Sequence, residues 1–140
     1  MEWLKEKLEI TTGDKGLYPF TDAVSGKISG WSINEGMCFL YLQHTSASLV
    51  ISENYDPSAT RDIVHFFEGL VPESQFWMEH TLEGGDDSSS HIRSALTRTD
   101  LTIPIENGHI CLGRWQGIYL FEHRAGRQLR IVLLRCIKMN

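Results

Sequence analysis

The fold is organised around residues 43–53, whose sequence is QHTSASLVISE. An apolar run over residues 37–42 precedes this stretch and is typical of a buried strand. Three hydrogen-bonding side chains beginning at His44 then interrupt the apolar pattern, which resumes and continues to Glu53. The pattern predicts two strands joined by a tight reversal with His44 at its mouth. An imidazole and a carboxylate at strand ends favour either a catalytic site or a capped turn with a surface histidine.

The composition predicts a single globular domain over residues 1–140, with 41% hydrophobic and 22% charged residues. The formal charge of −5 argues against a broad nucleic-acid-binding surface, because such a surface needs a basic stripe. Arginines concentrate in the C-terminal quarter, which favours a solvated strand face over a local anion pocket. They are Arg114, Arg124, Arg127, Arg130 and Arg135.

The sequence also bears on the compartment. No stretch approaches the roughly 20 apolar residues of a membrane helix, and residues 1–7 lack the apolar core of a signal peptide. The three cysteines, Cys38, Cys111 and Cys136, lie far apart in apolar runs. Each is predicted to be a small buried core residue rather than a disulfide partner or a metal ligand. These features predict a cytoplasmic protein that binds neither membrane nor nucleic acid.

Strand patterns outnumber helix patterns along the chain. Residues 3–10 alternate as a half-exposed strand, and the segment after Asp100 reads as strands and hairpins, with an Asn-Gly turn at residues 107–108. We therefore expect an α+β fold with a largely antiparallel sheet, joined mainly by hairpins, and two to three helices.

Three segments carry helix signals. A polar pair at residues 21–22 can cap a first helix, and an Asp cap followed by Pro at residues 56–57 predicts a second helix that Pro72 stops. Ser88 or Ser89 can cap a short third helix that carries His91. The Gly-Asp-Ser run ahead of this third helix is predicted to be a loop.

Three histidines, His44, His80 and His91, stand where regular elements are predicted to begin or end. Imidazoles together with carboxylates suit zinc or another divalent transition ion. Their spacing fits no compact zinc motif, so scattered surface histidines are the alternative. The carboxylates that could join them are Glu53, Asp62, Asp86, Asp87 and Glu122.

Residues 113–117, Gly-Arg-Trp-Gln-Gly, form a second unusual stretch. Glycines on either side let the backbone bend or approach closely, and the Gln116 amide offers both a donor and an acceptor. A strand bulge packed by Trp115 explains the same residues.

Taken in order, these residues resemble the YjbQ family, also called the secondary thiamine-phosphate synthases. The resemblance runs from about residue 5 to residue 137. It is carried by residues 44–47, 53–57, Asp62, His80, 90–92, 104–105, Gly108, 112–116 and Glu122.

The resemblance implies a small, single α+β domain that forms a homotrimer, with histidine-lined sites near the subunit contacts. It makes His44, His80 and His91 the expected ligands of a divalent metal ion, zinc or magnesium, or the contacts of an anion.

The activity implied by the resemblance joins a pyrimidine diphosphate to a thiazole phosphate and releases pyrophosphate. Such a phosphorylated metabolite needs a cation beside its oxygens, which the metal ion or an arginine could supply. The alternatives are a non-catalytic trimer that binds a metal or small ligand, and a structural protein whose histidines cap turns. The catalytic residues expected for the enzyme are Glu53, Asp62 and Gln116, and the expected substrate contacts are Thr45, Ser46 and Arg114.

Two stretches depart from the family pattern. The family usually has an Asn-Asp pair ahead of the third histidine, where this chain has Asp86-Asp87. An acidic residue usually follows soon after the equivalent of Glu122, where this chain has His123-Arg124. We expect the second departure to place positive charge on the rim of the site and to change substrate preference.

Overall fold

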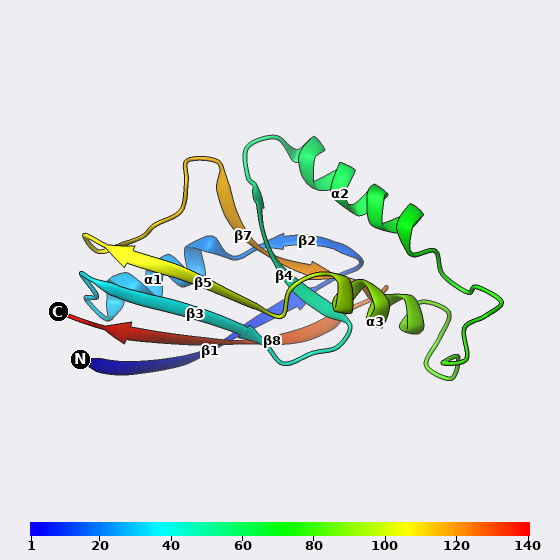
Figure 1. Ribbon diagram of the computed structural model, residues 1–140, viewed down its shortest axis with the longest axis horizontal. Coiled ribbons are helices and arrows are strands. Elements are labelled where there is room, and N and C mark those ends of the chain that lie inside the picture. Colours follow the sequence, from blue (N-terminus) through cyan, green and yellow to red (C-terminus); the bar gives the residue numbers. More distant parts are fainter.

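Three helices and eight strands make up the computed structural model, which describes residues 1–140 (Figure 1). The strands are β1 (Glu2–Thr12), β2 (Gly16–Pro19), β3 (Gly36–Leu42), β4 (Ala47–Glu53), β5 (Asp100–Glu106), β6 (His109–Ile110), β7 (Gln116–Glu122) and β8 (Gln128–Lys138). The helices are α1 (Thr21–Gly30), α2 (Pro57–Leu70) and α3 (Asp87–Leu96).

The strands form two antiparallel sheets, with the orders β1-β8-β3-β5-β6 and β2-β7-β4. The predicted α+β class with largely antiparallel strands is confirmed. The long β1–β8 pair joins the two ends of the chain, so both termini lie at the same edge (Figure 1). None of the helices is both long enough and apolar enough to cross a lipid bilayer.

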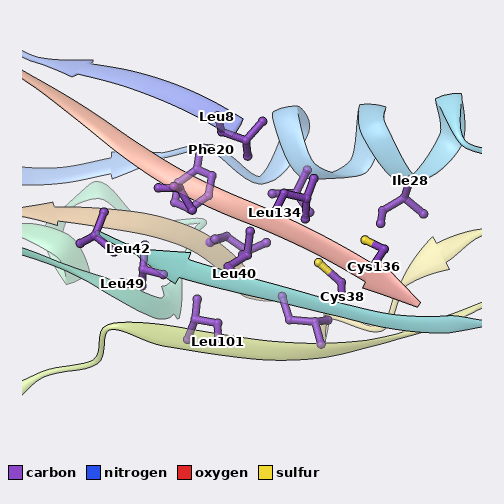
Figure 2. Close-up of a cluster of buried hydrophobic side chains, with 14 of the residues drawn as sticks. Leu8, Phe20, Ile28, Cys38, Leu40, Leu42, Leu49, Leu101, Leu134 and Cys136 are labelled. Carbon is purple, nitrogen blue, oxygen red and sulfur yellow. The ribbon is translucent and has the colours of Figure 1, made fainter. Parts of the chain in front are cut away.

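The core lies between the five-stranded sheet on one side and the three-stranded sheet with α1 on the other. In β5, side chains alternate between buried and exposed, so Leu101, Ile103 and Ile105 all face the core. Figure 2 shows the same layer in β3 and β8, where Cys38 and Cys136 stand opposite each other with Ile28 of α1 nearby.

The expected reversal between β3 and β4 is wrong. β3 lies between β8 and β5 in the larger sheet, whereas β4 pairs with β7 in the smaller sheet. Residues 43–46 therefore carry the chain from one sheet to the other. Hairpins are also rarer than expected, because β5–β6 is the only hydrogen-bonded pair of consecutive strands. Apolar patterns identify strands but do not name their partners.

Local turn and cap signals gave mixed results. Asp56 caps α2 by accepting a hydrogen bond from the Ser58 N–H, and the Asn107-Gly108 turn has positive φ at both residues, as predicted. The third helix begins at Asp87, slightly earlier than the serine caps predicted. The first helix lacks a side-chain cap, because the Thr21 hydroxyl instead accepts a hydrogen bond from Ile118 N–H.

The cysteine prediction is correct for Cys38 and Cys136, which are buried, and wrong for Cys111, which is exposed. Cys111 follows the two-residue strand β6 at the edge of the larger sheet, so an apolar neighbourhood in the sequence did not bury it.

Candidate metal centre

A groove of about 670 Å³ opens beside α3 and the 43–46 linker. Two of the three predicted histidine ligands approach each other there, with ring centroids of His80 and His91 5.2 Å apart. The lining residues are His44, Thr45, His80, Ser88, His91, Ile92, Ser94, Ala95 and Thr99.

The donor atoms of His80, Asp87 and His91 all lie within 4.8 Å of one another. Asp87 Oδ2 is 2.6 Å from His80 Nε2 and 3.1 Å from His91 Nε2. Asp87 and His91 share a face of α3 because they are four residues apart. The cluster combines one buried carboxylate with two more accessible imidazoles.

The hydrogen bonding of His91 shows why this cluster suits a cation. Its Nδ1–H donates to the Thr45 carbonyl oxygen at 2.8 Å, which leaves Nε2 of the neutral ring without a proton. That bare nitrogen faces the Asp87 carboxylate oxygen, so two acceptors meet at 3.1 Å. A proton or a metal ion is required between them, and a ring nitrogen fixed by a backbone carbonyl is the usual support of a metal-bound histidine.

Asp87 has the charge that a metal ligand needs. Burial raises the pKa of its carboxyl, but the His80 hydrogen bond and the charge of Arg124 act in the opposite direction, and the pKa lies below its ordinary value. The carboxylate is therefore ionised at neutral pH, as metal binding requires.

His44 lies in the same groove but turns its ring nitrogens elsewhere. Its Nε2 accepts a hydrogen bond from Ile131 N–H at 2.9 Å, and its Nδ1 lies 3.4 Å from Arg130 Nη1. Burial and the Arg130 charge lower the pKa of His44, so the ring is neutral at pH 7. A metal-binding role for His44 stays a prediction and would require its bond to Ile131 to break.

Behind His44 lies a buried ion pair. Arg130 continues the inward-facing stripe of β8, so its guanidinium enters the sandwich and binds both carboxylate oxygens of Glu122, at 2.7 and 2.5 Å. The Thr12 hydroxyl donates to Glu122, and Arg130 Nη2 donates to the Ser46 hydroxyl at 2.9 Å. Ser46 is thus held inside this network, whereas Thr45 is exposed in the groove.

The other predicted site residues do not join the groove within one chain. Glu53 and Gln116 face each other at the far end of β4 and β7, about 20 Å along the strands from Ala47. Arg114 precedes β7 at that far end and stacks on Trp115, and Asp62 is exposed on α2. Their catalytic and substrate-binding roles stay predictions.

The expected positive rim is wrong. His123 is fully buried and hydrogen-bonded to Ser48, and burial together with the charges of Arg93 and Arg130 lowers its pKa to about 3. Arg124 reaches inward to Asp87 at 2.7 Å instead of presenting free charge.

The arginine-rich C-terminal quarter is no shared anion pocket. Arg124 and Arg130 pair with separate carboxylates, and Arg135 donates to backbone carbonyls. The solvated strand face that we favoured is also wrong for these residues, because Arg127 is exposed in the turn before β8 and Arg130 is buried on β8.

The sequence placed Asp87 among five acids that could join the histidines, and the structure selects it from that set. Placing the third helix start at Asp87 would have put Asp87 and His91 four residues apart on one face. No local signal could have identified Arg124, because its partners lie 37 and 38 residues earlier in the chain.

Comparison with known proteins identifies the family. A family model described as UPF0047 protein YjbQ-like matches residues 6–138. The chain belongs to this family. UPF0047 protein sll1880 of Synechocystis is 43% identical over 130 residues, which cover 93% of this chain and 88% of that protein. UPF0047 protein YjbQ of Escherichia coli O157:H7 is 39% identical over 93% of this chain and 95% of its own length.

Solved structures share the fold. A conserved hypothetical protein from Thermus thermophilus has a TM-score of 0.84 and 31% identity, covering 94% of this chain and 99% of that one. A YjbQ/UPF0047 family protein from Clostridium acetobutylicum has a TM-score of 0.82 and 30% identity, covering 96% and 99% of the two chains. Both comparisons span nearly the full length of the two chains that are compared.

Proposed function

We propose that His80, Asp87 and His91 bind a divalent transition-metal ion, and that the groove beside them accepts the phosphate end of a small phosphorylated metabolite. The observation that carries the metal proposal is the 3.1 Å contact between two hydrogen-bond acceptors, His91 Nε2 and Asp87 Oδ2. Two imidazole nitrogens and one carboxylate oxygen favour zinc over magnesium, which prefers oxygen ligands.

The lining of the groove supports a phosphate group. Its lining includes residues that carry hydroxyl groups, among them Thr45, Ser88 and Thr99, and it includes neither lysine nor arginine. The bound metal ion would supply the positive charge that phosphate oxygens need. Arg114, the other cation considered, lies at the far end of β4 and β7 in the same chain.

The resemblance to secondary thiamine-phosphate synthases supports a transferase that joins a pyrimidine diphosphate to a thiazole phosphate. In that reaction the departing pyrophosphate needs charge stabilisation more than it needs a strong nucleophile. A groove with hydroxyl groups around one cation site suits this requirement. The second candidate is a non-catalytic protein that binds the same metal or ligand, because the same residues serve it.

We also propose a homotrimer in the cytoplasm. Phe76 and Leu82 in the loop between α2 and α3 are 99% and 96% exposed, which favours burial against another copy. Three free thiols favour a reducing compartment. Sedimentation of the purified protein should give three times the 16.0 kDa mass of one chain, and a monomer would contradict the trimer.

The metal proposal is tested by elemental analysis and zinc titration of the wild type beside His80→Ala, Asp87→Asn and His91→Ala. We expect one zinc ion per chain in the wild type and its loss in each variant. His109→Ala is the matched control, because His109 is an exposed histidine on β6. His44→Ala tests whether His44 is a metal ligand. Loss of zinc from this variant would make His44 a ligand, and retention of zinc would leave it as a residue that only lines the groove. Wild-type protein that binds no metal under any loading condition would overturn the proposal.

The enzyme and the binding protein are separated by steady-state turnover of the two phosphorylated substrates. Turnover of the zinc-loaded wild type that disappears in His91→Ala supports the synthase. Pyrophosphate release equal to the uncatalysed background, despite full zinc occupancy, would favour the non-catalytic protein.

A further inference from the structure

We infer that Arg124 is a positioning residue for the proposed metal centre, because its guanidinium holds one oxygen of Asp87 and leaves the other facing the two imidazoles. The inference rests on the metal-binding function proposed above.

All three guanidinium nitrogens of Arg124 donate a hydrogen bond. Nη1 donates to Asp87 Oδ1 at 2.7 Å, Nε donates to Asp86 Oδ2 at 3.2 Å, and Nη2 donates to the Glu83 carbonyl oxygen at 2.8 Å. Gly84, with φ of +108°, makes the turn that follows this carbonyl, a conformation that side-chain-bearing residues rarely adopt. Arg124 thus binds the loop before α3 and the first residue of α3 together.

Arg124 is itself anchored to the buried interior. Its backbone N–H donates to Glu122 Oε2 at 3.0 Å, and Glu122 is the wholly buried carboxylate that Arg130 also binds. The next residue, Ala125, donates its backbone N–H to Asp86 Oδ2 at 2.8 Å. The turn after β7 is therefore attached to the sandwich on one side and to the start of α3 on the other.

This arrangement decides which Asp87 oxygen reaches the groove. Oδ1 accepts from Arg124, while Oδ2 lies between His80 and His91. The Asp87 side chain is only 5% exposed, so water cannot readily replace the guanidinium. Without the planar fork of Arg124, the carboxylate could rotate, and the two neighbouring acids at the start of α3 would repel each other.

The experiment measures the affinity for Co²⁺ or Zn²⁺ in the wild type, Arg124→Lys, Arg124→Met and Arg127→Ala. Arg127 is the matched control, because it is an exposed arginine in the same β7–β8 turn. Arg124→Lys retains the charge and loses the fork. We expect both Arg124 variants to bind about tenfold to a hundredfold more weakly, as is usual when the support of a metal ligand is lost. Arg127→Ala should bind like the wild type.

The visible absorption of bound Co²⁺ reports coordination geometry, and urea denaturation reports stability. We expect the Co²⁺ spectrum of Arg124→Lys to change, which loss of stability alone would not cause. A folded Arg124→Lys with wild-type affinity and spectrum would overturn the inference while leaving the metal proposal intact, even if Arg124→Met fails to fold. A wild type that binds neither ion would overturn both.

Discussion

The two ends of the β4–β7 pair differ sharply in what they gather. At one end Ala47 faces Glu122, whose carboxylate is wholly buried against Arg130. At the other end, about 20 Å away, Glu53 faces Gln116. Glu53 there accepts hydrogen bonds from backbone N–H groups two and three residues on, and Gln116 accepts one from three residues before.

The difference shows that a polar side chain joins a site when other elements of the fold reach it. Thr12 of β1, Arg130 of β8 and Ser46 of the linker all converge on the Glu122 end. The Glu53 end lies beside its own loop and satisfies its polar groups locally. Equal residue types on one pair of strands therefore produce a buried network at one end and a capped turn at the other.

The largest effect should come from breaking the buried pair. Glu122→Gln keeps the shape of the side chain and leaves the Arg130 charge buried without its counter-ion. We expect the free energy of unfolding to fall by about 3–5 kcal/mol in urea denaturation. The milder Thr12→Val removes one buried donor to Glu122 and should cost about 1 kcal/mol. A loss below about 1 kcal/mol for Glu122→Gln would mean that the Glu122–Arg130 pair stabilises the fold no more than an ion pair on the surface does, which would contradict this prediction.

The free energy of unfolding should fall over a defined range of acidic pH, because His123 is buried in its neutral form at the groove end of the β4–β7 pair. Folded His123 stays neutral down to about pH 3, whereas the unfolded chain takes up a proton below the ordinary pKa of 6.5. The contribution of neutral His123 to the free energy of unfolding is therefore fully present above pH 6.5. It is lost as pH falls towards 3, by about 1.4 kcal/mol for each pH unit. His44, whose pKa is also lowered, contributes in the same direction.

Urea denaturation from pH 6.5 down to 4.5 would measure this slope, because the lowered pKa of Asp87 places its own contribution below 3.8. The slope gives the number of protons that the chain takes up on unfolding. His123→Gln should lower that number by about one, while His109→Gln, at an exposed position, should not change it. An unchanged slope in His123→Gln would contradict a neutral buried His123.

The smallest effect should come from the opposite end of the strands. Glu53→Gln removes a charge whose partners are nearby backbone N–H groups, so the free energy of unfolding should change by about 0.5 kcal/mol or less. Zinc affinity should remain that of the wild type, because Glu53 lies far from the groove. A loss as large as that of Glu122→Gln would abolish the contrast between the two ends.

Much of the local structure could be predicted from the sequence. The Asp56 cap with the following proline predicted α2, the Asn107-Gly108 pair predicted its turn, and alternation predicted the strands. These signals act within a few residues, since caps, turns and periodicity reflect the chemistry of neighbouring positions. Two of the three histidines expected to lie together, His80 and His91, do so.

The pairings could not be predicted in the same way. Leu42 and Ala47 lie five residues apart in the chain, yet they belong to strands of different sheets. Cys111 sits in an apolar run but on a sheet edge, so it is exposed. Hydrophobic patterns record that a residue prefers burial, and they do not record which surface buries it.

By itself, then, the sequence determined the three helices, every strand except β2, the antiparallel α+β class and the family of the chain. Only the tertiary structure decided that Asp87 joins His80 and His91, that Arg124 holds it, and that His44 turns towards Ile131. The physical reason is distance along the chain. A hydrogen bond between Arg124 and Asp87 closes a separation of 37 residues, and its partners are chosen by how the two sheets and α3 pack.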